Sequence, residues 1–175
     1  ALQLAADSGL LSGAAVQASA GDVTPGRLAR ADFTYGPGNL LGQVTQSGGV
    51  PGGAVIEQGS TADGSYLRLA DGSQICWHSF DAGDTMALGD GSWADPYRSA
   101  GLSWTFPMDF AEVPTGFSGC CRTDANSVAR IQYLVGRYLT ASQASQMQVV
   151  RGTAADTASA LAPTTVHVTA SGRWF

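Results

Sequence analysis

The chain has 175 residues, a net charge of −5 at pH 7 and only 13% charged residues, a length that fits one domain or one domain with an extension. The negative charge and the lack of a basic cluster argue against a protein that binds along nucleic-acid phosphates. No apolar run approaches the roughly 20 residues of a membrane span, and the N-terminus lacks the basic and apolar regions of a signal peptide.

Residues 1–53 are poor in aromatic side chains and rich in Gly, Ala, Ser and Asp. Short helices are possible at 1–6 and 10–20, but glycines interrupt them, and turn signals become dense at 36–38 and 48–53. Alone, this segment could not bury enough surface to offset its ordering entropy. It is either disordered or ordered by wrapping around other copies. We favour the second alternative, an extended trimerisation stalk, because the spacing of its apolar residues resembles intertwined contacts: Leu10, Leu11, Val16, Leu28, Phe33, Leu40, Leu41 and Val44.

Residues 54–175 are predicted to form a small all-β head, a sandwich or barrel, because short β-rich runs alternate with turn signals. The predicted strands are 54–58, 66–70, 74–80, 102–106, 116–121, 132–139, 147–151 and 166–175. The long loops at 81–100, 122–130 and 152–163 are the usual location of recognition residues on a rigid β-scaffold.

The clearest local signal is Asp71-Gly72 between two β-rich runs, which predicts a type I′ hairpin turn with positive φ at both central residues. The following run, 75–77, is continuously apolar, so the strand is expected to be covered on both faces. Trp77, Trp104 and Trp174 lie within strand patterns and are expected in the core.

Three cysteines do not suggest a disulfide scaffold. Cys76 is expected to be a buried free thiol, and the adjacent Cys120 and Cys121 are too close in sequence for an ordinary disulfide. Neither spacing suits zinc. Assembly in a reducing cytoplasm follows.

Several stretches resemble the tail fibres of bacteriophages. Asp22-Val-Thr-Pro-Gly-Arg-Leu-Ala-Arg-Ala-Asp-Phe33 is similar to a stalk segment, and residues 46–57 together with 63–77 resemble the junction between stalk and head. Residues 104–114 and 168–175 resemble the C-terminal sandwich, which is similar to the H-type lectin fold. The resemblance covers residues 22–175.

This resemblance implies a homotrimeric appendage on the surface of a phage or of a phage-derived particle such as a gene transfer agent, made in the bacterial cytoplasm. Its stalk would join other particle proteins, and its head would recognise a bacterial surface polysaccharide. The competing interpretation is a purely structural connector or decoration protein that docks another virion component.

Sugar recognition needs an aromatic face for the pyranose ring and planar polar groups for its hydroxyls. The loop 90–98 offers both kinds of side chain. Alternatively, its aromatic residues pin a long loop to the head or to a neighbouring subunit. The predicted glycan-binding residues are Trp93, Asp95, Tyr97 and Arg98, joined by Arg137 and Tyr138 from a strand end. Alternatively, Arg137 and Tyr138 are only a pair on a strand face.

Metal binding and catalysis are both less well supported. His78 and His167 are the only histidines; one His per chain can supply three ligands on a three-fold axis, but a histidine beside a strand is usually structural. Most acidic residues stand beside Gly or Pro, where they serve turns, and no nucleophile-elbow pattern is present. The sequence therefore predicts no metal, no cofactor and no enzymatic activity.

Overall fold

The structure is a computed structural model that describes residues 16–18, 24–28, 40–123, 132–136, 138–151 and 164–175. The chain divides into two compact units, residues 1–41 and 42–175. In the first unit, Val16 forms a parallel bridge with Leu28, and the Gln17 amide donates to the Leu28 carbonyl at 3.0 Å. The short helix that is possible over 10–20 does not include Val16. The stalk residues Leu10, Leu11 and Phe33 lie outside the described residues.

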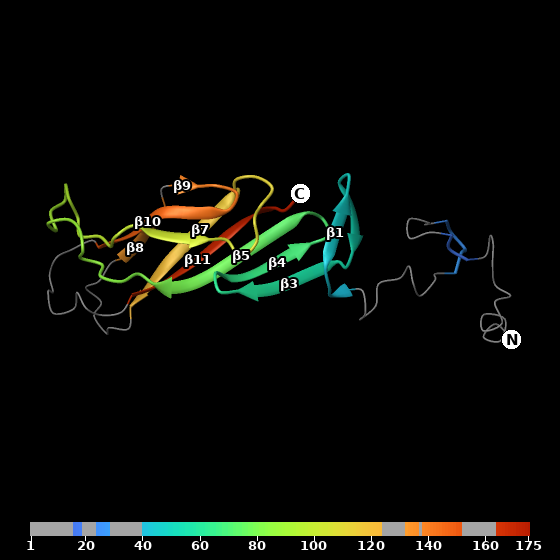
Figure 1. The fold of residues 1–175 in the computed structure, drawn as a ribbon, viewed down its shortest axis with the longest axis horizontal. Helices are drawn as coiled ribbons and strands as arrows, with labels where there is room; N and C mark the ends of the chain where they lie inside the picture. The colour runs from blue at the N-terminus through green and yellow to red at the C-terminus, as the bar shows by residue number, and fades with distance from the viewer. Residues whose placement is uncertain (1–15, 19–23, 29–39, 124–131, 137, 152–163) are drawn as a thin grey trace. The chain divides into compact units, whose positions relative to one another are not determined.

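The C-terminal unit, residues 42–175, is an all-β structure of two packed sheets, as predicted (Figure 1). One sheet has five antiparallel strands in the order β3-β4-β5-β11-β7; the other has the order β6-β10-β8, with β9 also paired to β10. β1 and β2 form a separate hairpin. The bounds are β1 Val44–Ser47, β2 Val50–Gly53, β3 Ile56–Thr61, β4 Gly64–Leu69, β5 Ser73–Asp81, β6 Leu102–Thr105, β7 Gly116–Thr123, β8 Gln132–Val135, β9 Tyr138–Leu139, β10 Gln143–Arg151 and β11 Thr164–Arg173.

The core lies between the two sheets, because alternate side chains of each strand point inward. An aromatic row runs through it: Trp104 meets Phe106 edge to face at 4.9 Å, and Phe106 meets Phe110 at 5.1 Å. The Trp104 Nε1 donates to the Asp63 carbonyl at 2.7 Å, which satisfies its one polar atom. The buried residues that complete the core are Cys76, Ala82, Ala144, Met147, Val149, Val166, Val168 and Ala170.

All eight predicted strand runs overlap observed strands, although the run 132–139 is divided into β8 and β9. The hairpin of β1 and β2 falls in the segment assigned to the stalk. It is attached to the C-terminal unit, since the Val44 amide donates to Glu57 Oε2 at 3.0 Å and the Gly42 amide donates to the Ile56 carbonyl at 3.0 Å. The compact unit therefore starts at Gly42.

The Asp71-Gly72 turn is a real hairpin turn, but not of type I′. Gly72 has φ +92°, whereas Asp71 has negative φ. The Gly72 amide donates to the Leu69 carbonyl at 3.0 Å, and the Ser73 amide donates to Asp71 Oδ1 at 2.8 Å. This pattern fits a three-residue loop that ends in a left-handed glycine. The turn between β1 and β2 has the pattern that was predicted for Asp71-Gly72, since Gly48 and Gly49 both have positive φ.

Two expectations for β5 fail because only one face of this strand is covered. Trp77 is 43% exposed and Ile75 is 38% exposed, whereas Cys76 between them is fully buried. In this continuous apolar run the side chains therefore alternate between buried and exposed, and the outer face of the strand is exposed to solvent. Trp104 is a core residue, as predicted, and Trp174 is partly buried with its Nε1 donating to the Leu69 carbonyl at 2.9 Å.

The two histidines lie on opposite faces of the five-stranded sheet. His78 packs inward against Phe80 and Trp104, and His167 faces outward with its Nδ1 2.6 Å from the Ser79 hydroxyl. Among the described residues, no group of three or more His, Cys, Asp or Glu side chains is arranged to hold a metal ion. No helix in the described part of the chain has the length and apolarity of a membrane span.

The three cysteines are free thiols in different surroundings. Cys76 is buried, and burial raises the pKa of its thiol. Burial also raises the pKa of the Cys121 thiol to about 11, with a smaller contribution from the neighbouring Cys120. Cys120 is exposed on β7 and is therefore the accessible thiol of the three.

Candidate functional site

The predicted recognition loop follows β5 and is attached to β10 of the opposite sheet. Arg98 pairs with Leu88 inside the loop, with backbone hydrogen bonds of 2.9 and 3.0 Å, and it bridges to Val150. The Arg151 amide donates to the Tyr97 carbonyl at 2.9 Å, and the Ser99 amide donates to the Val149 carbonyl at 2.9 Å. The loop is therefore connected to both sheets of the sandwich.

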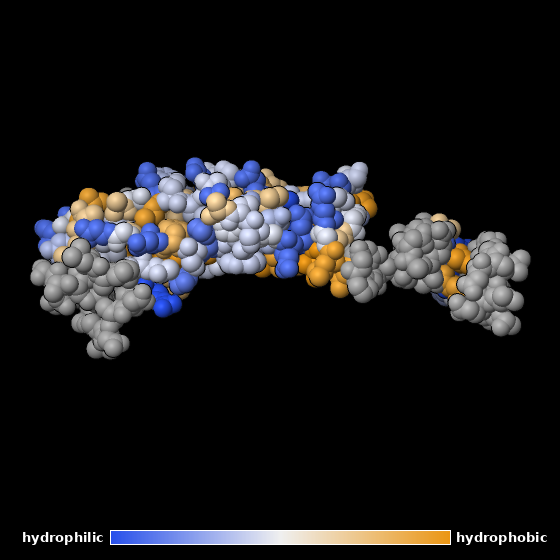
Figure 2. Space-filling view, turned by 60° about the horizontal axis from the view of Figure 1, so that its bottom comes forward, coloured by the Kyte–Doolittle hydropathy of each residue, from blue (hydrophilic) through white to orange (hydrophobic). Residues whose placement is uncertain are grey.

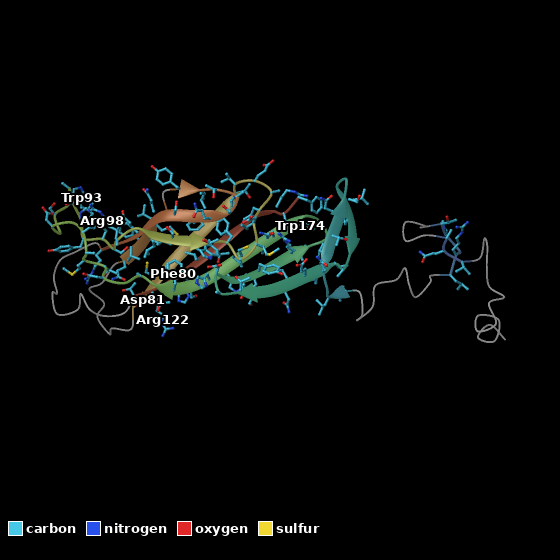
Figure 3. All side chains as sticks on the ribbon, viewed as in Figure 1. Phe80, Asp81, Trp93, Arg98, Arg122 and Trp174 are labelled. Atoms are coloured by element: carbon cyan, nitrogen blue, oxygen red, sulfur yellow. The ribbon has the colours of Figure 1, made fainter. Side chains whose placement is uncertain are left out.

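This loop lies at the end of the C-terminal unit farthest from the hairpin of β1 and β2 (Figure 3). The chain enters beside the beginning of β3, where the Gly42 amide bonds to the Ile56 carbonyl. Ile56 pairs with Leu69, the last residue of β4, so the end of β4 and the beginning of β5 lie at this same end of the unit. The loop begins only after β5 has run its nine residues to Asp81, a length of about 27–30 Å in an extended strand. The loop is thus at the distal end of the unit from the point where the chain enters.

Inside the loop, local hydrogen bonds fix the turn that carries Trp93. The Asp90 and Gly91 amides donate to the Asp95 carbonyl at 3.0 and 3.1 Å, and the Asp95 amide donates to the Ser92 hydroxyl at 3.0 Å. The Ser92 amide donates to Asp90 Oδ1 at 2.8 Å. Hydrogen bonds from Ser92 hold the pKa of Asp90 below its usual value. The tip of the loop is therefore an ordered turn.

Trp93 stands on this turn with its side chain fully exposed. Behind it, Arg98 Nη1 donates to Asp95 Oδ1 at 2.5 Å and to the Pro96 carbonyl at 3.1 Å. The Arg98 side chain is 28% exposed and that of Asp95 is 51% exposed, while Tyr97 is partly buried. An open indole face and a partly solvated carboxylate–guanidinium pair thus occupy the same loop.

The other two predicted residues do not extend this group. Arg137 lies outside the described residues. Tyr138 is 59% exposed, but its strand partner is Ser145, five residues before Val150 along β10, a separation of roughly 17 Å in an extended strand. The structure therefore brings together Trp93, Asp95, Tyr97 and Arg98, and places Tyr138 elsewhere on the four-stranded sheet.

Sequence reasoning missed the residues that hold the loop in place. Ser99 is completely buried, and its hydroxyl accepts a hydrogen bond from the Val149 amide at 3.0 Å. The two residues are fifty positions apart in the sequence. A serine followed by Ala and Gly carries no local signal for such a contact. The only local signals for an ordered loop are its glycines and the Asp and Ser residues that cap its turns.

Gly89 should be essential for the conformation of this loop. It has φ +89°, and a Cβ there would lie 2.3 Å from the Pro96 carbonyl oxygen. We expect Gly89→Ala to open the loop, so that the Asp90 and Gly91 amides exchange their hydrogens with solvent faster, as measured by hydrogen–deuterium exchange. Gly83→Ala is the matched control, because Gly83 has φ +66° with no atom within 4 Å of an added Cβ. Equal exchange in the two variants would contradict this account.

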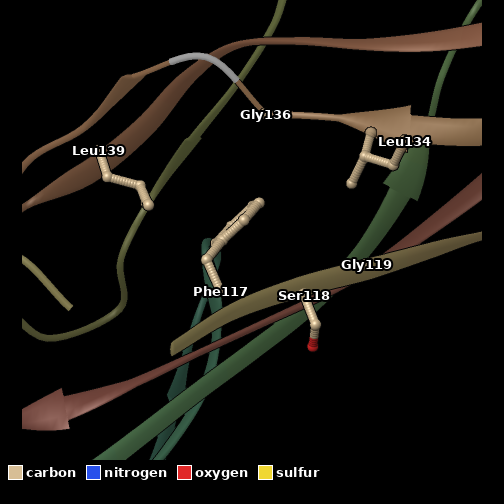
Figure 4. A pocket seen from close by; sticks show the side chains of 6 residues that line it. All are labelled: Phe117, Ser118, Gly119, Leu134, Gly136 and Leu139. Carbon is tan, nitrogen blue, oxygen red and sulfur yellow. The ribbon is translucent and has the colours of Figure 1, made fainter. Parts of the chain in front are cut away.

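A hollow of about 310 Å³ lies between β7 and the segment of β8 and β9 (Figure 4). It opens at the edge of the sandwich, where β7 pairs only with β11 among the described strands. Phe117 and Leu139 give it apolar walls, and none of the described residues that line it is charged. Its lining residues are Phe117, Ser118, Gly119, Leu134, Gly136 and Leu139.

Comparison with known proteins gives weak structural similarity and no family assignment. No family model matches the chain, and no curated protein matches it. Among solved structures, the chain is similar to the C-terminal part of the Pseudomonas aeruginosa R1 pyocin fibre, with 14% identity and a TM-score of 0.44, covering 68% of this chain and 29% of that one. An N-truncated R1-type pyocin tail fibre gives 13% identity and a TM-score of 0.43, covering 68% and 88%.

The C-terminal part of the P. aeruginosa R2 pyocin fibre gives 17% identity and a TM-score of 0.42, covering 69% of this chain and 27% of that one. The chain therefore spans less than a third of the R1 and R2 C-terminal fibre chains.

Proposed function

We propose that this chain is part of a receptor-binding appendage on the surface of a phage or phage-derived particle, and that it binds a bacterial surface glycan through the loop that carries Trp93. In this proposal the protein is a homotrimer, is made in the bacterial cytoplasm, joins other particle proteins through residues 1–41, and has no catalytic activity. The tail-fibre resemblance of residues 22–175 suggests the setting. The observation that carries the binding function is Trp93, fully exposed on an ordered turn.

The chemistry of the loop fits a neutral or weakly charged sugar. An exposed indole gains free energy when a ligand covers it: about 100 Å² of apolar contact contributes roughly 2–3 kcal/mol. Pyranose rings present such a contact through their CH groups, and the Asp95 and Arg98 side chains, 51% and 28% exposed, retain hydrogen-bonding capacity for hydroxyls. Because the turn is already ordered, binding would not have to order it, which favours affinity.

Glycan binding by the full chain tests the proposal. We expect Trp93→Ala to weaken binding to the preferred polysaccharide by about tenfold or more, since an aromatic anchor at the centre of a site typically contributes around 2 kcal/mol. A glycan array identifies the polysaccharide, and titration calorimetry with it gives the dissociation constants. Tyr138→Ala is the control, because Tyr138 is 59% exposed on β9 and its partner Ser145 lies five residues from Val150 along β10.

The outcomes separate the possibilities. Equal affinities of the native protein and Trp93→Ala would show that the loop is not the binding site. No binding to any bacterial glycan by the native protein would remove the receptor-binding function.

A structural connector is the second candidate, and it is favoured by β7, whose outer edge pairs with no other described strand. An unpaired strand edge can add a strand from another protein, and the neighbouring hollow has apolar walls at Phe117, Leu134 and Leu139. Under this alternative, the C-terminal unit would be enclosed by other virion components. Immunogold labelling of intact particles with an antibody to this unit decides between the two: labelling supports the receptor-binding protein, and labelling only after disassembly supports the connector.

A further inference from the structure

The outer face of the five-stranded sheet is a broad open surface with apolar residues at its middle. The Trp77 and Ile75 side chains project from β5, the third of five strands, and are 43% and 38% exposed. Their cross-strand partners on β11 are Thr169 and Ser171. The residues that form the middle of this face are Gln58, Ser60, Ser65, Leu67, Ile75, Trp77, Ser79, Ser118, Cys120, His167, Thr169 and Ser171.

We infer that this outer face, with Trp77 at its centre, is the contact surface between identical copies of the chain. The inference deepens the proposed function, since it rests on the proposed trimer and states which surface its subunits share. Three features of the described residues support a second copy as the occupant: charge, satisfied polar groups and shape.

Among the described residues, the middle of the face carries no Asp, Glu, Lys or Arg. The described charged side chains of this face stand in the end rows, at Asp81 and Arg122 on one side and at Arg173 on the other. A surface that packs against equivalent copies of itself avoids burying like charges together, which would be costly. In Figure 2, pale residues of intermediate hydropathy fill the middle of the C-terminal unit, and strongly hydrophilic residues lie mainly around it.

Polar side chains on this face already bond to one another. The Ser60 and Ser65 hydroxyls are 2.8 Å apart, and the Ser79 hydroxyl lies 2.6 Å from His167 Nδ1. Groups paired in this way can be buried at lower cost than unpaired ones. They also offer less to sugar hydroxyls than the side chains of the loop 90–98 do, so protein packing suits this surface better than a glycan.

The relief and the size of the face also fit a protein contact. A shallow hollow of about 300 Å³ lies beside Trp77 over β3 and β4, and another of about 240 Å³ lies over β7 and β11, lined by Ser118, Cys120 and Thr169 among others. The exposed Trp77 indole of one copy could fit into a hollow on the face of another copy. Five strands and the nine residues of β5 make a face of roughly 700 Å², close to the approximately 800 Å² per partner of a standard interface.

Cys120 provides the test, because it is the exposed thiol and lies on this face. In the native full-length protein we expect maleimide to label Cys120 at least about tenfold more slowly than in Trp77→Arg, because the thiol is accessible only when the contact opens. Peptide mass spectrometry distinguishes Cys120 from its neighbours. Sedimentation of the native protein should give three times the chain mass of 17.9 kDa.

Thr169→Arg is the second variant, in case Trp77→Arg does not fold, and it should also expose Cys120. Ser103→Arg is the control: Ser103 is exposed on β6 of the other sheet, so labelling of Cys120 should stay slow. Fast labelling of Cys120 in the native protein, or a native protein that sediments as a single chain, overturns the inference. If Cys120 is protected from maleimide in a protein that binds no glycan, the interface is supported and the proposed glycan binding is wrong. A failure of the interface can therefore be distinguished from a failure of the proposed function.

Discussion

Replacing Trp104 with Ala is expected to lower the free energy of unfolding of the C-terminal unit by about 3–5 kcal/mol, the usual cost of removing a buried aromatic side chain. Trp104 is 2% exposed and lies at the centre of the row that joins His78 to Phe106. The change also leaves the Asp63 carbonyl without its indole donor. For a domain with a total stability of roughly 5–15 kcal/mol, this is a large fraction.

Guanidinium denaturation followed by circular dichroism measures this loss. Trp93→Ala is the matched control, because it removes the same side chain from a fully exposed position and should change stability by no more than about 0.5 kcal/mol. Similar losses in both variants would mean that Trp104 does not organise the core.

Gly64→Ala should destabilise the same unit by about 2 kcal/mol or more. Gly64 follows the turn between β3 and β4 and has φ +122°, a region that side chains rarely adopt. An added Cβ would lie 2.4 Å from the Trp77 carbonyl oxygen and 2.9 Å from the His78 Cβ, and neither is the end of a flexible side chain. The strand pair of β4 and β5 would have to separate to accommodate it.

Gly48→Ala separates this effect from the general cost of positive φ. Gly48 has φ +59° with no atom within 4 Å of an added Cβ, so its replacement should cost only about 1 kcal/mol. The difference in unfolding midpoint between the two variants measures the steric part. If Gly64→Ala proved no more destabilising than Gly48→Ala, the close approach of β4 to β5 at this point would be refuted.

Strand positions were predictable from the sequence because period-two alternation and turn residues are local properties. In β11, Val166, Val168 and Ala170 are buried, and His167 and Thr169 lie on the other face, as the alternation indicates. The partners of each strand are not local. Ile75, Cys76 and Trp77 are all apolar, so the sequence could not reveal that β5 has one open face; that depends on which sheet covers it.

The candidate site was predictable in part for the same reason. Trp93, Asp95 and Arg98 lie within six positions of each other, so the composition of this one loop was enough to predict that they stand together. The attachment of the loop to Val149 and Val150 depends on contacts across about fifty residues. The separation of Tyr138 from the loop depends on the register of β9 on β10. Neither fact follows from residue types.

The opposite positions of the chain entry and the Trp93 loop have a mechanical consequence. A pulling force applied at Trp93 and resisted at Gly42 runs along β3, β4 and β5, where β3 pairs with β4 over six residues and β4 pairs with β5 over four. Because antiparallel hydrogen bonds lie perpendicular to the strands, such a load shears many of them together instead of unzipping them one at a time. Tension between the two ends of the unit therefore loads these strand pairs in shear.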